Sequence, residues 1–291
     1  DNSVFSIKQR AVRSMGEKIA GLVTDQFLNE ALWEARRELD QDPNILRWSF
    51  RQKFLQDIGN CIPGQYSVTV PTDLRDPNTP KNILGLRIGK QGRNIEYVDQ
   101  VRFQQYYANV GHTTLASSIT GASTSLVLTS SGDFDESGNV VIAASSVSET
   151  LDTVAYTTNT ESTATLGTVT GIADSKSSGV DVWQNATFGY PTFYTISNGT
   201  IYFDTPFDDD LAGENIWMDY YGELVVYDSD ADTLDEPEYD MFVSFLKYKI
   251  KYLKANGKIK PKEDPDYLEW LIRKEALIAK ELNAQDIYLV P

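Results

Sequence analysis

The spacing of hydrophobic residues changes twice along this 291-residue chain, and that change limits the folds open to it. Near both ends, apolar residues recur every three or four positions, which is typical of an amphipathic helix. Through much of the middle they alternate with polar residues, which is typical of a strand with one buried face. The sequence therefore predicts helices from both ends and antiparallel strands between them.

Helix-start signals support this reading at both ends. Thr24 is suited to cap a helix and Asp25 to occupy its first turn. Asp264 and Pro265 mark a later start in the same way. The expected helices cover residues 4–23, where the pattern is weaker, and residues 24–40, 48–60, 235–257 and 264–284. We expect one shared core for Phe27, Leu32, Phe50, Phe54, Phe242, Phe245 and Leu246.

The clearest strand signal lies in residues 192–205. Tyr194 and Ile196 alternate with polar residues before the pair Asn198-Gly199, and the alternation resumes after it. Asn-Gly favours the type I′ turn of a two-residue hairpin. Further strands are expected over residues 66–70, 83–89 and 215–225, with 92–99 returning beside 83–89, and residues 100–109 are expected to form a short helix or an extended segment.

Residues 111–187 differ from their surroundings, because threonine, serine and glycine dominate and there is one basic residue against eight acidic ones. Apolar residues still recur at strand spacing, at Leu115, Ile119, Leu126, Leu128, Val140 and Ile142, with glycines between the runs. A disordered linker would lack this pattern. We therefore expect an inserted all-β domain that projects outward from a discontinuous host domain made of residues 1–110 and 188–291.

The expected fold class is accordingly α+β. It comprises a helical bundle from both termini plus a small antiparallel sheet, with an inserted all-β domain. Hydrophobic residues make up 41% of the chain, which is enough for a substantial core. No stretch approaches the length of a membrane span, so we expect no membrane partner.

The net charge of −16 is unevenly distributed. Residues 191–240 carry 14 acidic side chains and no Lys or Arg. A protein that reads DNA sequence would normally present a basic face, so this charge argues against that class. The acids either form a solvated surface or face a negatively charged molecule that must not bind to them. The candidates for such a surface or lumen are Asp208, Asp209, Asp210, Asp228, Asp230 and Asp232.

Catalytic and metal-binding patterns are weak in this sequence. Cys61 and His112 are the only residues of their types, so a His-ligated metal and a cysteine zinc site lack ligands, and no Ser-His-Asp set can be built away from His112. Residues 133–138 begin like a calcium loop, but Ala144 stands where the bidentate acid belongs. A glycosidase-type pair of carboxylates stays open, since no spacing singles out two acids. We expect no enzyme activity, no metal and no cofactor.

Three stretches carry a resemblance to a known family. They read "FLNEALWEARRELD", "WSFRQKFLQDIGNCIPGQYSVTVPTDLRDPNTPKNILGLRIG" and "EPEYDMFVSFLKYKIKYLKANG". Together they resemble the head-to-tail adaptor proteins, also called connector or neck proteins, of tailed bacteriophages. Residues 113–157 resemble a small β-module found repeatedly in phage structural proteins. The simplest adaptors lack such an insert.

The resemblance implies a structural virion protein at the head–tail junction, made in the cytoplasm of the bacterial host. It implies a ring of this chain, of twelve copies, that docks under the portal protein and extends the channel for double-stranded DNA without binding it specifically. Downstream neck or tail proteins would attach to the ring. The alternative is a receptor- or glycan-binding tail module, which the Thr/Ser-rich insert favours, and a glycan hydrolase comes third.

The chain ends in the apolar run Ile287, Tyr288, Leu289 and Val290, which lacks a helical period. We expect it either to fold back on its own subunit or to leave the last helix and lie against the portal or a neighbouring subunit. Tyrosine is a frequent anchor at interfaces, and an extended segment can add to a sheet edge or fill a groove. These four residues are therefore the candidate docking segment.

Overall fold

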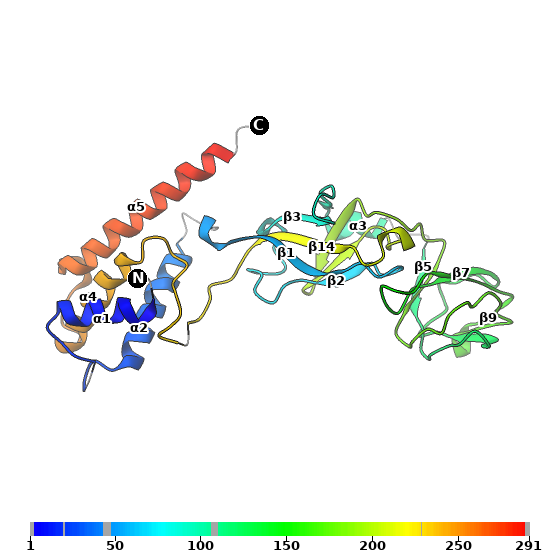
Figure 1. Ribbon diagram of the computed structural model, residues 1–291, viewed down its shortest axis with the longest axis horizontal. Coiled ribbons are helices and arrows are strands. Elements are labelled where there is room, and N and C mark those ends of the chain that lie inside the picture. The colour runs from blue at the N-terminus through cyan, green and yellow to red at the C-terminus, as the bar shows by residue number, and fades with distance from the viewer. Residues whose placement is uncertain (1–2, 20, 43–47, 106–109, 228, 289–291) are drawn as a thin grey trace. The chain divides into compact units, whose positions relative to one another are not determined.

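The computed structural model (Figure 1) describes residues 3–19, 21–42, 48–105, 110–227 and 229–288, with side chains to residue 282. The chain divides into two compact units. The first unit comprises Asp1–Gln52 and Tyr221–Pro291, and the second comprises Lys53–Tyr220. We describe each unit by itself.

Five α-helices and 14 strands lie within the described residues. The helices are α1 Val4–Ser14, α2 Asp25–Asp40, α3 Gln100–Gln104, α4 Asp240–Lys254 and α5 Pro265–Tyr288. The strands are β1 Gln52–Asn60, β2 Ser67–Thr69, β3 Ile83–Ile88, β4 Glu96–Tyr97, β5 Gly111–Thr114, β6 Ser125–Val127, β7 Gly138–Ile142, β8 Asp152–Tyr156, β9 Thr158–Thr160, β10 Thr165–Gly167, β11 Asp181–Gln184, β12 Phe193–Ser197, β13 Thr200–Phe203 and β14 Asn215–Tyr221.

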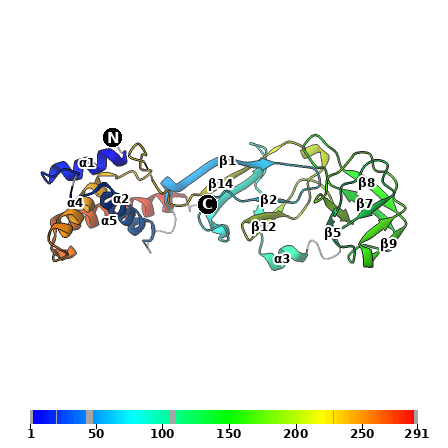
Figure 2. The same cartoon turned by 90° about the horizontal axis from the view of Figure 1, so that it is seen from below.

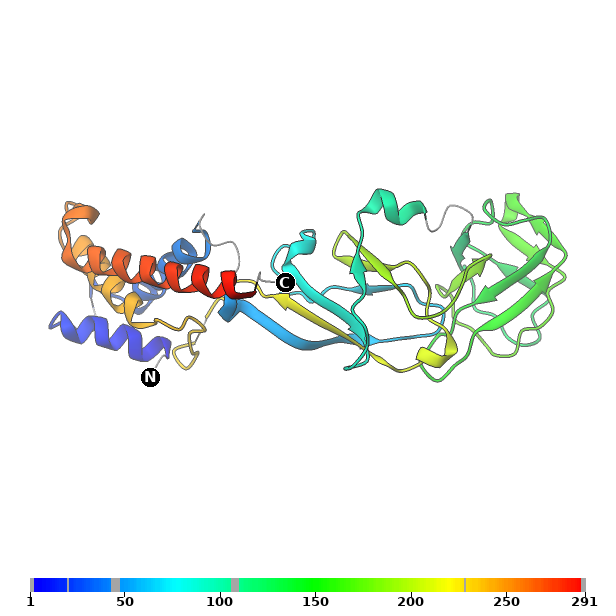
Figure 3. The same ribbon diagram turned by 90° about the horizontal axis from the view of Figure 1, so that it is seen from above.

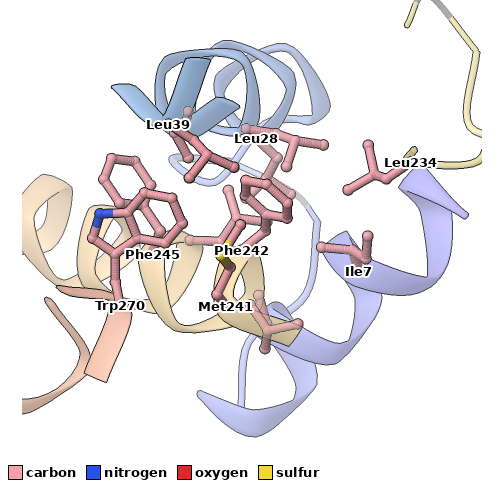
Figure 4. Close-up of a cluster of buried hydrophobic side chains, with 14 of the residues drawn as sticks. Ile7, Leu28, Leu39, Leu234, Met241, Phe242, Phe245 and Trp270 are labelled. Atoms are coloured by element: carbon pink, nitrogen blue, oxygen red, sulfur yellow. The ribbon is translucent and has the colours of Figure 1, made fainter. Parts of the chain in front are cut away.

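The first unit contains α1, α2, α4 and α5, which share one hydrophobic core (Figure 4). The start of α2 is as expected, because the Thr24 hydroxyl accepts the backbone N–H of Phe27 at 3.1 Å. The start of α5 is also as expected, because Asp264 Oδ1 accepts the N–H groups of Asp266 and Tyr267 at 2.9 and 3.2 Å. Both caps satisfy backbone donors that the first helical turn leaves free.

The middle strands of the second unit form two sheets. One has the order β1-β14-β3 and the other β2-β13-β12-β4, and they share a core. Figure 3 shows β1 in blue running beside β14 in yellow. The expected hairpin is confirmed, with Ile196 opposite Ile201 and with Asn198 and Gly199 at φ of 50° and 73°. Helix α3 lies against β12 (Figure 2).

Residues 111–187 form the other two sheets, with the orders β5-β11-β7-β8 and β6-β10-β9. A third core belongs to them alone, and Leu126, Val140, Ile142, Val154, Leu166 and Val182 are its fully buried members. Residues 111–187 nevertheless belong to the same compact unit as the middle strands. The inserted-domain boundaries at 110/111 and 187/188 stay a prediction.

The predicted fold class is wrong. The chain is strand-rich, with four separate sheets among the described residues, and is not a helical bundle from both termini with one small sheet. Several strands have only two or three residues, as β4 and β9 do. Strands this short leave too little alternation in the sequence to be recognised, and hydrogen bonds to a partner strand fix them, to β12 for β4 and to β10 for β9.

The expected helix over residues 48–60 is also wrong. Ser49–Arg51 forms one 3₁₀ turn, and the strand β1 follows. Phe54 is 58% exposed and lies outside the helical core that it was expected to join, whereas the other six expected residues pack in or against that core. Over so short a stretch, the spacing of apolar residues is compatible with either a helix or a strand. Pairing with the distant strand β14 therefore determines that this segment is a strand.

The return of residues 92–99 beside β3 is likewise only partly observed. The N–H of Ile95 donates to the carbonyl of Leu86 at 2.8 Å, as a hairpin would require. Strand β4 then leaves β3 and pairs in parallel with β12, with Tyr97 opposite Tyr194. A parallel partner almost 100 residues away cannot be read from local alternation.

Candidate functional site

The C-terminal candidate segment does not lie where the sequence placed it. Helix α5 continues through Ile287 and Tyr288, so these two residues belong to the helix and not to an extended tail. Leu289 and Val290 lie outside the described residues. Docking of this segment to a portal or neighbour stays a prediction.

Helix α5 has two different faces. Its inner face packs in the first core through Trp270, Leu277 and Ile278. Glu281 anchors the same side, because its Oε1 accepts the hydroxyl of Ser49 at 2.6 Å and its Oε2 accepts the Ser49 N–H at 3.1 Å. The inner face therefore fixes α5 to its own unit along most of its described length.

Apolar residues recur on the opposite side of α5 at steps of three and four. We call this side the outer face of α5; it comprises Leu268, Ile272, Ala276, Ala279 and Leu282, with the exposed Glu275 among them. Leu268, Ile272 and Leu282 are 41%, 67% and 41% exposed. An exposed apolar stripe on a long helix is a common contact surface for a partner. None of the described helices combines the length and apolar character that crossing a membrane requires.

The six candidate acids are divided between the two units. Asp208 caps the 3₁₀ turn Asp209–Leu211, and Asp209 Oδ1 accepts the N–H of Leu151 at 2.9 Å. These two acids therefore stabilise loops of the second unit. Asp230 and Asp232 lie in the first unit, and Asp228 lies outside the described residues. Their role as a surface or lumen stays a prediction.

Acids between residues 229 and 240 neutralise buried cations of the first unit. The side chain of Lys8 is fully buried and contacts Asp25 at 2.6 Å and also Asp230. Arg36 and Arg51 both contact Glu236 Oε1, at 2.9 and 3.0 Å. Buried charges persist only when they are paired, so this part of the acidic block has an internal structural role that the charge count could not reveal.

A pocket of about 340 Å³ lies in the second unit, between the middle strands and the strands of residues 111–187. Its walls come from the loop before β2, helix α3, and strands β5, β11, β12 and β13. We call it the aromatic pocket. The residues that line it are Tyr66, Gln100, Phe103, Gln104, Val110, His112, Trp183, Thr195, Ser197 and Tyr202.

The rings at this pocket hold one another in place. His112 stacks on Trp183 with ring centres 4.0 Å apart, and the edge of Tyr66 meets Trp183 at 4.9 Å. The indole N–H of Trp183 donates to the carbonyl of Gly64 at 2.9 Å. His112 Nε2 lies 2.8 Å from Asp181 Oδ1. Burial, with smaller contributions from the Asp181 carboxylate and a neighbouring tyrosine, raises the pKa of Tyr66 to about 12.

One polar atom at the pocket is unsatisfied. Thr195 is 2% exposed, and its hydroxyl has no hydrogen-bond partner within the described part of the chain. A buried hydroxyl without a partner costs free energy, and such groups in folded proteins call for an explanation. The described lining includes no Lys, Arg, Asp or Glu. The more open polar side chains of the lining, Gln100, Gln104 and Ser197, are uncharged, so the pocket can hold a neutral molecule that has both apolar and hydrogen-bonding parts.

Sequence reasoning considered only His112 among these residues, and only as an unpaired candidate for catalysis. Thr195 and Ser197 look like the solvent-facing half of an alternating strand. The structure covers that face of β12 with α3 and with residues of 111–187. Within the described residues, no group of three or more His, Cys, Asp or Glu side chains is arranged to hold a metal ion.

Comparison with known protein families finds no match to this chain, and comparison with curated proteins finds no significant similarity. The function is therefore argued from the residues and from the resemblance described above.

Proposed function

We propose that this chain is a non-enzymatic structural protein of a tailed-phage virion. It forms a head-to-tail adaptor ring, of twelve copies, that docks under the portal protein, extends the DNA channel and offers the attachment surface for the tail. The resemblance of residues 27–89 and 236–257 to phage adaptors supports this proposal. Its location is the head–tail junction, after synthesis in the cytoplasm of the host.

The outer face of α5 is the observation that carries the proposal. A head-to-tail ring needs a surface on each subunit that contacts a different surface on the next copy. Ile272, at 67% exposed, lies in the middle of this apolar stripe. The inner face of α5 is fixed in the core, so a partner bound to the outer face would be held rigidly relative to the rest of the first unit.

The charge of the chain also supports a role around DNA without specific binding. A net charge of −16 on each subunit would be multiplied in a ring. DNA phosphates would be repelled from such a channel wall, and the repulsion keeps the DNA free to move. Repulsion of this kind extends about 10 Å at moderate salt.

Size measurement of the purified chain, alone and with portal-bearing heads, tests the proposal. Ile272→Glu is expected to abolish ring formation or head binding, because it replaces an exposed apolar side chain of the contact surface with a second carboxylate beside Glu275. Leu22→Glu is the matched control, since Leu22 belongs to the same unit and is 64% exposed but lies off α5. If both variants assemble as the unaltered chain does, the outer face of α5 is not the contact surface and no longer supports the proposal.

The alternative function is a receptor- or glycan-binding tail module. Such modules are usually trimers, whereas an adaptor forms or joins closed rings. Electron microscopy or native mass spectrometry of the assembled particle distinguishes the two. A stable trimer that does not bind portal-bearing heads would overturn the adaptor proposal.

A further inference from the structure

We propose that the aromatic pocket binds a neutral saccharide ring, either as a free sugar or as a unit of a longer glycan. The inference does not depend on the adaptor proposal, because it rests on a different unit of the chain. Two observations carry it: the cavity itself and its aromatic lining, whose polar members are uncharged.

The size of the cavity suits a small molecule. Its volume of about 340 Å³ falls at the lower end of the range for ligand pockets, which begins at about 300 Å³. The stacking of His112, Trp183 and Tyr66 holds the walls without a ligand. A preformed site of this kind loses little conformational entropy on binding.

The lining selects against charged ligands. An anion would find no Lys or Arg among the described lining residues. A cation would be drawn to exposed aromatic faces, but Trp183 is 1% exposed and one of its faces is covered by His112. A charged group placed here would lose its hydration without a counter-charge on the wall.

The lining also selects against a purely apolar ligand. Gln100, Gln104 and Ser197 add side chains that each donate and accept hydrogen bonds. Sugar hydroxyls donate and accept in the same way, and the C–H face of a sugar ring offers apolar surface to Tyr66 and Tyr202. A saccharide ring therefore matches both halves of the wall.

Ligand-observed saturation-transfer NMR of the full chain tests this inference. The neutral probes are methyl α-D-glucopyranoside, methyl β-D-galactopyranoside, N-acetyl-D-glucosamine and L-rhamnose, each at millimolar concentration. Tetramethylammonium and benzoate are the charged probes. At least one neutral sugar is expected to bind and both charged probes to fail. Binding of tetramethylammonium or benzoate without any neutral sugar, or of no probe at all, would overturn the inference.

Two variants locate the binding. Ser197→Ala should weaken the binding of the selected sugar about fivefold, the factor that one neutral hydrogen bond of about 1 kcal/mol provides. Tyr202→Ala should weaken it at least as much. Thr200→Val is the matched control, because Thr200 lies in β13 of the same sheet but does not line the pocket. Binding that Ser197→Ala and Tyr202→Ala both leave unchanged would place the sugar elsewhere and contradict the inference.

Chain length distinguishes the two sources of the sugar. The trimer of N-acetylglucosamine is compared with its monomer, or the trimer of whichever probe binds. Tighter binding of the trimer indicates a unit within a glycan, and equal binding indicates a free sugar or a terminal unit. Loss of all binding in the trimer would contradict the glycan form of the inference and leave the free sugar.

Discussion

Replacing Thr195 with valine should stabilise the second unit, although Thr195 lies in the interior. Its hydroxyl is buried and has no partner within the described residues. An unsatisfied buried hydroxyl costs about 1–3 kcal/mol. Valine has nearly the same shape, suits a strand and removes that cost. We expect Thr195→Val to raise the free energy of unfolding by about 1–2 kcal/mol.

Thr113→Val is the matched control and should have the opposite sign. Thr113 is also a buried strand threonine of the same unit, at 8% exposed, but its Oγ1 accepts the N–H of Ser130 at 3.1 Å. Losing one hydrogen bond should lower the free energy of unfolding by about 0.5–1.5 kcal/mol. The two variants should therefore differ by about 1.5–3.5 kcal/mol.

Urea denaturation followed by tryptophan fluorescence and far-ultraviolet circular dichroism measures both variants. In thermal melts, a gain of 1 kcal/mol corresponds to about 2–4 °C for a unit of this size. If Thr195→Val loses stability as Thr113→Val does, the Thr195 hydroxyl already has a partner in the folded chain. An unchanged midpoint would also refute the reasoning, because it would mean that cavity water satisfies the hydroxyl.

Three further changes test other parts of the structure. Glu236→Ala should cost about 3–5 kcal/mol, because it leaves two buried arginines without their shared carboxylate, while exposed Glu238→Ala should change stability by less than about 0.5 kcal/mol in the same denaturation assay. Gly64→Ala should cost more than about 2 kcal/mol in thermal melts, because φ is +83° and a Cβ would come within 2.3 Å of Ala143 Cβ. Burial, followed by two nearby carboxylates, raises the pKa of the Cys61 thiol to about 12, so the folded chain should resist iodoacetamide at pH 8 and react once unfolded. The thiol of the unfolded chain ionises at a lower pH than that of the folded chain. Cys61 therefore stabilises the fold below pH about 9, and this contribution is lost as the pH rises towards about 12. The stability–pH profile of Cys61→Ala should lack this loss.

In the first unit, the sequence predicted the helix caps but not the contacts between distant segments. The caps of α2 and α5 were predicted correctly because Thr24 and Asp264 act on backbone donors two or three residues away. Helix α4 begins at Asp240, five residues later than expected. The loop before it instead brings Glu236 to Arg36 and Arg51, which are about 200 residues away in sequence, and no local pattern encodes that meeting.

The aromatic pocket shows the same difference between local features, which the sequence predicts, and long-range packing, which it does not. Alternation in β12 gave the strand, and Asn198-Gly199 gave its turn, because both are properties of adjacent residues. Whether Thr195 faces water or a closed pocket depends on what packs over the strand. Helix α3 and residues 110–112 and 183 supply that cover from elsewhere in the chain.

By itself, the sequence determined the elements whose signals lie within a few residues, namely the helices α2 and α5 and the β12–β13 hairpin. The tertiary structure alone decided that residues 52–60 form a strand, that β4 joins β12 in parallel and that the strands divide into four sheets. The physical reason is that helices satisfy their backbone hydrogen bonds internally, whereas a strand must find its partner elsewhere in the chain. Burial of Thr195 and exposure of the outer face of α5 follow from that long-range packing.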